Sequence, residues 1–420
     1  MKVFKFGGAS VNNIERIKNV STILKSYPNE KILVVISAMG KTTNALEKVT
    51  EAFYAGNKAE ALSLFEVIKQ GHLSTLKYLI TLDWKEATEN LLNFFTEVEW
   101  LLHDKPVKEY NYYYDQIVCA GELLSTSIVS SFLNEEGIMN TWIDVRDIFR
   151  TDDNFRDANL DWDYTQKQVN EVIQPLFLST DIILTQGFIG STNENESTTL
   201  GREGSDYSAA IFANMLNAEN LTIWKDVEGV MNADPKEFSD AKFIAALSFD
   251  EVIEMAYYGA QVIHPKTIKP LQNKNIPLYV KCFLQPELPG TVISRKPVHN
   301  LPPIIVIKTN QVLMELNSKD FSFVSETLVS RLYEIFAEIK IRPNLTQSGA
   351  ISMLCCLDDI PEKIERLALA ASSLFEVQIE KNLVLLTIRH YNKEIVDSLT
   401  TGKTIELEQK TINTVQVLMK

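Results

Sequence analysis

The residues best suited to chemistry in this 420-residue chain lie in one stretch, 198–210, which reads TTLGREGSDYSAA. Gly201 and Gly204 permit positive φ and let the backbone come close to a ligand. The planar guanidinium of Arg202 matches a carboxylate, and Asp206 can orient a lysine or hold a metal ion near phosphates. Because the helix predicted to follow has an N-terminus that attracts anions, we expect this stretch to form the floor of a phosphoryl-transfer site.

The same stretch also has a simpler interpretation. Ser205 or Asp206 can cap the apolar helix that follows, and Arg202 can form an ordinary surface ion pair. The pattern GxxGSD does not by itself distinguish a loop-to-helix junction from an active site. The distinction therefore depends on other segments of the chain.

Further glycine turns lie beside predicted strands, at Gly7–Gly8, Gly40 and Gly187–Gly190. Strands that end at glycines and lead into helices are typical of a doubly wound α/β sheet, whose ligands bind at the carboxyl ends of the strands. We therefore expect these turns and Gly201–Gly204 to face one crevice.

Two common nucleotide-binding motifs are incomplete or missing. Gly40-Lys41-Thr42 resembles the end of a P-loop, but the first glycine of that motif is replaced by Val35. No GxGxxG occurs in the sequence, which argues against a dinucleotide-binding domain. We therefore assign anion binding to the separate glycine turns.

Hydrophobic patterns predict the elements that position these turns. Short β-branched runs predict buried parallel strands, and amphipathic runs between them predict helices. A helical excursion is predicted over about 45–110. In the segment 115–137 we expect a turn or short strand before Gly121-Glu122 and a buried helix after it. The predicted strands are 2–6, 31–39, 141–149, 181–190, 221–225 and 277–283.

Composition limits the partners. The hydrophobic content of 45% can form a large core, and the net charge of −14 argues against nucleic acid or an anionic membrane. The N-terminus has no apolar signal region, and we expect no apolar run approaching the roughly 18 residues that span a bilayer. The cysteines show no CxxC spacing, which indicates reduced core residues; they are Cys119, Cys282, Cys355 and Cys356.

The acidic loop 151–163 is the strongest candidate for a metal site. Its carboxylates lack the spacing of a calcium loop, so we favour a solvated loop and expect no metal ligands from the protein.

The length favours two or three domains, and prolines clustered over 286–303 indicate a linker. We expect an α/β catalytic domain over 1–297 and a smaller α+β domain over 298–420. The second domain is predicted to run strand, helix, strand, helix, strand, strand, followed from Tyr391 by a short helix and a hairpin.

Seven segments, in chain order, resemble the motif set of the aspartokinases: KFGGAS, SAMGKTTN, GELLST, QGFIG, TTLGREGSDYSAA, WKDVEGVMNADP and GAQVIHPKTI. The resemblance covers about residues 1–295. It implies the amino acid kinase fold, a three-layer α/β/α sandwich with a mostly parallel sheet, and an ACT-like regulatory domain in the tail. It also implies transfer of the γ-phosphoryl group of Mg·ATP to the side-chain carboxylate of L-aspartate, the entry to lysine, threonine and methionine synthesis.

The resemblance also implies roles for individual residues. The acceptor carboxylate is already ionised near pH 7, so the reaction needs positioning and charge neutralisation without a base. Lys5 would meet the transferring phosphoryl group, and Asp206 would organise that lysine. Arg202 would bind the substrate carboxylate, and Glu122 its ammonium group. The other residues implied for the aspartate pocket are Ser37, Thr43 and Phe188.

Three of the residues singled out have structural alternatives. Lys5 can be a lysine on an edge strand, and Glu122 can be a first-turn helix residue that interacts with the helix dipole. We expect His264, which precedes a proline at a helix end, to be a helix cap.

The nucleotide site implied by the resemblance departs from the family pattern at several positions. A family lysine is replaced by Gln261, and we hypothesise that Lys225 supplies the missing cation. Ala9 replaces a threonine, and Met231 stands where an aromatic residue often lies beside adenine. The implied nucleotide-binding residues are Lys5, Gly7, Gly8, Ser10, Lys225, Asp226, Met231, Lys236 and Gln261.

The tail departs further. Asn344 and Ala350 stand where lysine-inhibited members carry carboxylates for the ammonium groups of the effector, so we expect lysine to bind poorly. The residues after His390 are too few for two helices and four strands, so the second ACT unit is expected to be abbreviated.

Alternatives exist in two classes. Glutamate, acetylglutamate and uridylate kinases share the fold, and a catalytically weakened amino acid sensor would explain Ala9, Met231 and Gln261. For the favoured aspartate kinase we expect ATP and Mg²⁺ as cofactors, no nucleic acid or membrane partner, a homodimer or larger homo-oligomer, and a cytoplasmic location.

Overall fold

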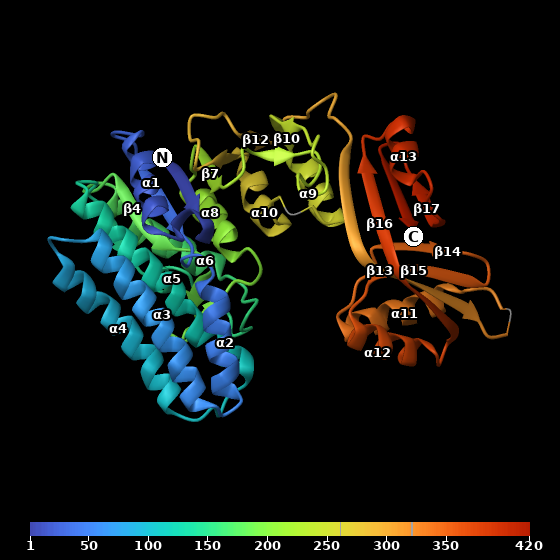
Figure 1. The fold of residues 1–420 in the computed structure, drawn as a ribbon, viewed down its shortest axis with the longest axis horizontal. Coiled ribbons are helices and arrows are strands. Elements are labelled where there is room, and N and C mark those ends of the chain that lie inside the picture. The colour runs from blue at the N-terminus through green and yellow to red at the C-terminus, as the bar shows by residue number, and fades with distance from the viewer. Residues whose placement is uncertain (261, 321) are drawn as a thin grey trace. The chain divides into compact units, whose positions relative to one another are not determined.

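The structure is a computed structural model that describes residues 1–260, 262–320 and 322–420 (Figure 1). These residues divide into two compact units. The first comprises Met1–Val230, Phe243–Ile253 and Val262–Val298; the second comprises Met231–Lys242, Glu254–Gln261 and His299–Lys420. Two short segments that precede residue 298 thus belong to the second unit.

The first unit is built on an eight-stranded sheet in the order β10-β12-β11-β7-β1-β2-β4-β3. Its neighbouring strands are parallel except for the antiparallel pair β11 and β12, so the predicted mostly parallel sheet is confirmed. The strands are β1 (Lys2–Phe6), β2 (Ile32–Ile36), β3 (Thr141–Ile143), β4 (Ile182–Gln186), β7 (Asn220–Lys225), β10 (Ala246–Ser248), β11 (Leu278–Cys282) and β12 (Thr291–Ser294).

Helices and short strands surround this sheet. The helices are α1 (Ile14–Lys25), α2 (Thr42–Tyr54), α3 (Lys58–Leu79), α4 (Trp84–His103), α5 (Tyr110–Glu135), α6 (Trp162–Gln168), α7 (Gln174–Leu176), α8 (Gly204–Met215), α9 (Phe249–Tyr258) and α10 (Pro265–Lys274). Three short helical turns are η1 (Gly8–Val11), η2 (Val145–Asp147) and η3 (Val169–Ile173). The remaining short strands are β5 (Ile189–Ser191), β6 (Ser197–Thr199), β8 (Val230–Met231) and β9 (Phe243–Ile244).

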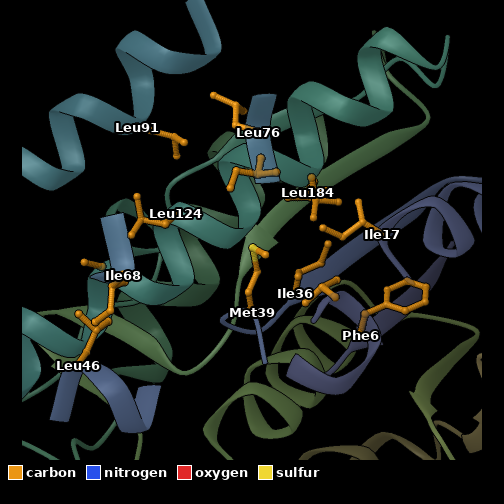
Figure 2. Close-up of a cluster of buried hydrophobic side chains, with 14 of the residues drawn as sticks. Phe6, Ile17, Ile36, Met39, Leu46, Ile68, Leu76, Leu91, Leu124 and Leu184 are labelled. Carbon is orange, nitrogen blue, oxygen red and sulfur yellow. The ribbon is translucent and has the colours of Figure 1, made fainter. Parts of the chain in front are cut away.

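The alternation of side chains along β1 divides the two faces of the sheet. Phe4 and Phe6 belong to a large apolar core formed with α1–α5, part of which Figure 2 shows around Ile36, Leu124 and Leu184. Because successive side chains of a strand point to opposite faces, Lys5 points to the other face, on which α8 packs. Strand β1 lies between β2 and β7, so the alternative of an edge-strand lysine is wrong.

Helix α5 corrects two predictions. The turn expected before Gly121 is absent, because Tyr110–Glu135 forms one continuous helix. A Cβ at Gly121 would lie 3.1–3.3 Å from Leu46, Thr42 and Ala38, so the glycine serves close packing. Contrary to expectation, α5 is also long and apolar enough to span a membrane by length and composition, but 83% of its apolar window is buried inside the protein.

The predicted linker contains a strand. The β-branched run Thr291–Ser294 forms β12 and pairs with both β10 and β11, so only its proline-containing flanks are irregular. Predicted strand 141–149 is shorter than expected, because after Ile143 the chain turns into η2.

The second unit is built on a six-stranded sheet in the order β14-β15-β13-β16-β18-β17, with antiparallel neighbours throughout. The predicted alternation of strand, helix, strand, helix and strand is confirmed, as are the short helix and the final hairpin, but β14 is an additional strand that was not predicted. The elements are β13 (Ile304–Ser318), α11 (Glu326–Ile339), β14 (Leu345–Ser348), β15 (Ser352–Asp358), α12 (Pro361–Ala371), β16 (Phe375–Arg389), α13 (Lys393–Thr400), β17 (Ile405–Lys410) and β18 (Thr414–Met419).

Two strands predicted over 375–390 are one long strand, β16. It pairs with β13 on both sides of an irregularity near Gln311, where Asn310 and Asn382 adopt positive φ. One half of the sheet forms a core with α11 and α12, and the other half packs with α13. The half of the sheet that packs with α13 is therefore made of residues 304–308 of β13, residues 383–389 of β16 and the strands that follow His390.

Two glycines of the first unit, Gly187 and Gly71, allow a matched test of close packing around a glycine. A Cβ at Gly187 would lie 2.7 Å from the Cα and Cβ atoms of Ser205, whereas Gly71 lies inside α3 with open space around it. We expect Gly187→Ala to lower the free energy of unfolding by about 2 kcal/mol and Gly71→Ala to raise it by up to about 1 kcal/mol. Urea unfolding followed by circular dichroism measures both, and equal effects of the two substitutions would contradict the packing.

Candidate active site

One cavity of about 670 Å³ in the first unit gathers most of the predicted site. It opens beside the carboxyl ends of β1, β2, β4 and β7 and the N-terminus of α8. The predicted residues that line it are Lys5, Gly7, Gly8, Ser10, Ser37, Thr43, Glu122, Phe188, Arg202, Asp206, Lys225 and Asp226. The simpler interpretation of 198–210 as a surface junction does not fit this position.

A buried ion pair lies at the centre of the cavity wall. The Lys5 Nζ atom is 2.6 Å from Asp206 Oδ1, and the two side chains are 11% and 5% exposed. Lys225 Nζ lies 4.0 Å from Asp206 Oδ2 and donates a hydrogen bond to the Val262 carbonyl at 2.7 Å. Burial alone would raise the pKa of Asp206, but the charges of Lys5 and Lys225 hold this pKa below its usual value. Asp206 is therefore an anion that fixes two lysines.

The glycine turns after β1 and β2 are packed against each other. The Gly40 N–H donates to the Gly8 carbonyl at 3.0 Å, and a Cβ at Gly8 would lie 2.8 Å from the carbonyl oxygens of Ala38 and Gly40. A Cβ at Gly7 would lie 3.3 Å from Lys5 Nζ. A side chain at Gly7 would therefore fill the space next to the lysine ammonium group, and one at Gly8 would collide with the turn after β2.

Glu122 is a buried carboxyl group with an unused oxygen. It lies in the interior of α5, so the alternative of a first-turn helix residue is wrong. Its Oε2 atom is buried and has no hydrogen-bond partner among the described residues. Burial raises the pKa of Glu122 to about 8, and the charge of Lys5 and the backbone N–H of Ala38 oppose this shift. Such a group can accept hydrogen bonds from a cation that enters the cavity.

Three residues on the loops around the cavity have a strained backbone. Arg156, Phe188 and Glu203 line the cavity and all have positive φ, at 72°, 71° and 55°. Such conformations cost non-glycine residues about 1 kcal/mol or more each, and they persist where surrounding contacts enforce them. The Phe188 N–H donates to Ser208 Oγ at 2.9 Å, which holds this residue against α8.

Two expectations about the start of α8 are wrong. The N-cap is Glu203 and makes no side-chain capping bond, so neither Ser205 nor Asp206 caps the helix. Gly201 has positive φ as predicted, but Gly204 does not. Gly204 is required because a Cβ there would lie 2.6 Å from the Phe188 ring. Asp206 remains in the first turn, free to pair with Lys5.

Two predicted nucleotide-binding residues, Met231 and Lys236, belong to the second unit. A third, Gln261, lies outside the described residues. His264 is the N-cap of α10 and accepts a hydrogen bond from the Lys266 N–H at 3.2 Å, which confirms the predicted cap.

Sequence reasoning missed Tyr114, Arg156 and Thr199, which also line the cavity. Buried Asp115 accepts hydrogen bonds from the backbone N–H of Arg156 at 3.0 Å and from both the N–H and the hydroxyl of Thr199. Burial raises the pKa of Asp115 to about 6 despite these hydrogen bonds. The sequence did offer one signal for Arg156, because it is a basic residue within the acidic loop 151–163.

Two carboxylates of that loop have structural partners. Asp152 accepts hydrogen bonds from Asn159, and Asp161 caps α6. The four cysteines of the chain are free and buried.

Comparison with known proteins agrees with this geometry. The sequence profile of the amino acid kinase family matches residues 1–282, and the chain belongs to that family. It is 32% identical over 398 residues to the lysine-sensitive aspartokinase 3 of Escherichia coli, covering 92% of this chain and 86% of that protein. It is also 32% identical to the chloroplastic aspartokinase 1 of Arabidopsis thaliana, covering 86% of this chain and 64% of that protein. Within the family, the chain is an aspartokinase.

Solved structures give the same assignment. E. coli aspartokinase III in complex with aspartate and ADP superimposes with a TM-score of 0.83 at 29% identity, covering all of this chain and 96% of that one. The complex of the same enzyme with lysine and aspartate gives a TM-score of 0.81 at 28% identity, covering all of this chain and 95% of that one. The predicted fold, an α/β/α kinase sandwich followed by a smaller ACT-like α+β domain, is confirmed.

Glu122 leads to a prediction about stability and pH. Because its pKa rises from about 4.5 in the unfolded chain to about 8 in the folded protein, its contribution to stability is present below pH 4.5 and is lost as the pH rises towards 8. We expect Glu122→Gln to gain stability relative to the parent by about 1 kcal/mol per pH unit over that window.

Thermal and urea unfolding at pH 5, 6.5 and 8 measure this difference. Glu30→Gln, which alters a partly exposed carboxylate beside Lys2, is the control and should follow the parent. Parallel pH profiles for Glu122→Gln and the parent would contradict a raised pKa.

Proposed function

We propose that this chain transfers the γ-phosphoryl group of ATP to the β-carboxylate of L-aspartate, giving ADP and 4-phospho-L-aspartate. The observation that carries the proposal is the arrangement in one cavity of the Lys5–Asp206 pair, the unpartnered Glu122 oxygen and the exposed guanidinium of Arg202. These groups suit an acceptor that carries both a carboxylate and an ammonium group.

The reaction needs charge neutralisation above all. Two anions, the acceptor carboxylate and the phosphate tail, must approach each other, and no proton has to be removed from the acceptor. Lys5 and Lys225, both fixed by Asp206, supply positive charge beside the Gly7–Gly8 turn. Both ammonium groups are largely shielded from solvent and fixed in advance, which makes such charges more effective.

Recognition of the acceptor depends on opposite charges at its two ends. The Glu122 carboxylate binds the ammonium group, and Arg202 binds the non-reacting carboxylate. An acid without an ammonium group would leave Glu122 buried and unpaired, which disfavours its binding. Ser37 and Thr43 supply hydroxyl groups on the same wall.

Magnesium is expected to arrive with the nucleotide. Mg²⁺ usually keeps several waters and binds through phosphates with one or two carboxylates, and the described residues contain no cluster of three or more potential ligands. The carboxylate of Asp226, in the same wall as Lys225, fits this limited role. A bound Mg²⁺ would neutralise phosphate charge. The compensation of Gln261 by Lys225 stays a prediction.

The protein is further proposed to act in the cytoplasm as a homodimer or larger homo-oligomer. The exposed edges of the antiparallel sheet in the second unit, β14 and β17, offer unpaired backbone groups for association between copies.

The activity is tested by trapping the acyl phosphate with hydroxylamine, with aspartate, glutamate or no acceptor. We expect aspartyl hydroxamate with aspartate only, and a loss of kcat of at least about a hundredfold in Lys5→Met, because one preorganised cation at the transferring group is removed. Lys2→Met, on the same strand, is the control and should retain activity. Equal ATP turnover with and without aspartate, or full activity of Lys5→Met, would refute the proposal.

Inhibition by lysine is a separate question in the second unit. The Asn344 amide is already engaged: its Oδ1 accepts from Lys308 Nζ at 2.7 Å, and its Nδ2 donates to Gln311 and Asp358 at 2.8 and 2.9 Å. A lysine ligand at this position would meet the ammonium group of Lys308 and no free carboxylate.

We therefore expect millimolar L-lysine to leave aspartate-dependent turnover nearly unchanged. The assay above, repeated at rising lysine concentration, tests this. Half-inhibition below about 1 mM, which corresponds to a binding free energy near −4 kcal/mol, would show that other residues of the tail recognise lysine.

A further inference from the structure

Arg156 is a second guanidinium in the wall of the aspartate cavity, and the role of Arg202 does not account for it. We propose that Arg156 is a substrate-binding residue that helps to bind the non-reacting carboxylate of the acceptor, and that Glu47 competes with this carboxylate for the guanidinium. This inference rests on the proposed aspartate kinase activity and adds a specificity-determining residue to it.

The backbone of Arg156 is held in place firmly. Its φ of 72° is unusual for a residue with a side chain, and its N–H donates to the fully buried carboxylate of Asp115. Asp115 also holds Thr199, which lines the same cavity, and the Ala158 N–H donates to the Thr199 carbonyl at 3.0 Å. The loop is thus fixed where it delivers Arg156 to the cavity.

The side chain of Arg156 is positioned by three weaker contacts. Its guanidinium lies 4.1 Å from the ring centroid of Tyr114 and 5.7 Å from that of Tyr110, and its Nη2 lies 3.1 Å from Glu47 Oε1. The two charged side chains are 40% and 34% exposed. Ion pairs this exposed contribute little to stability, so the guanidinium can exchange the carboxylate of Glu47 for that of a ligand. Tyr114, itself in the cavity wall, can keep the guanidinium plane oriented during this exchange.

Arg156 is also coupled to the loop of Arg202. A Cβ at Gly201 would lie 2.6 Å from Asp157 Oδ1 and 3.2 Å from the Arg156 carbonyl, so the two loops are in direct contact beside the residue that precedes Arg202. Two guanidinium groups carried on adjoining loops suit one carboxylate with four lone-pair sites. Glu47 follows Thr43 by one turn of α2, so the competing carboxylate comes from the helix that also supplies Thr43 to the cavity.

The test uses Arg156→Gly, because glycine adopts a φ of 72° without strain and the loop backbone is preserved. We expect the KM for aspartate to rise about tenfold, with kcat and the KM for ATP unchanged, because one charge-assisted contact to the acceptor is lost. Arg156→Lys, which keeps the charge without the planar fork, should lie between the parent and the glycine variant.

Glu47→Gln distinguishes substrate binding from a structural role. If Glu47 competes for the guanidinium, Glu47→Gln lowers the KM for aspartate by about two- to threefold. If the ion pair only holds the loop in place, Glu47→Gln and Arg156→Gly both raise this KM and lower the melting temperature. Asn195→Gly, at another positive-φ position, in the turn between β5 and β6 and outside the cavity wall, is the control for glycine substitution and should leave the KM unchanged.

The outcomes distinguish the proposed function of the protein from the proposed role of Arg156. Absence of aspartyl hydroxamate with the parent protein would refute the proposed function. Normal turnover by the parent, with an aspartate KM in Arg156→Gly within twofold of the parent value, would refute the role of Arg156 alone.

Discussion

The buried pair of Lys5 and Asp206 is the interaction on which the rest of the site depends. Each charge would be very costly to bury alone, and together they place an ammonium group at the end of the central strand β1 without leaving an unpaired ion. The pair requires that β1 presents Lys5 to the face covered by α8, and that α8 begins close enough to bring Asp206 within reach. The glycines at the ends of β1 and β4 allow this approach, since side chains there would collide with their neighbours.

Helix α5 organises one side of the cavity. Asp115 and Glu122 are two turns apart and therefore lie on one face, and Ser125 follows one turn later and donates to the Ser37 carbonyl at 2.8 Å. The three residues act differently: Asp115 holds two loops, Glu122 faces the cavity with an unused oxygen, and Ser125 attaches the helix to the end of β2. One rigid helix thus sets the spacing between groups from distant parts of the chain, at the expense of burying two carboxyl groups with raised pKa values.

The second unit is organised around two long strands. The long strands β13 and β16 run through both halves of the sheet, so the two halves share strands although each has its own apolar core. The bulge near Gln311 lies where the halves meet, and the network of Asn344, Lys308 and Asp358 gathers beside it. An effector at Asn344 would have to replace hydrogen bonds that already stabilise this region.

Local sequence determined much of this protein. The β-branched runs and the glycine turns were sufficient to predict the parallel sheet and a crevice at the ends of its strands, because side-chain alternation and backbone freedom act over a few residues. The kinase fold and most residues of the cavity, including Lys5, Glu122 and Arg202, were implied by the resemblance of the ordered motifs to those of the aspartokinases. The final hairpin and the cap at His264 were predictable for the same reason.

Tertiary contacts decided the rest. Gly121 suggested a break in the sequence, but packing against α2 makes it part of one continuous helix, because burial outweighs a local preference of about 1 kcal/mol. The positive φ of Arg156 and its place in the cavity depend on Asp115, some forty positions earlier in the chain. Likewise, the pairing of β16 along its whole length depends on β13. Such contacts join residues distant in sequence, and no local pattern encodes them.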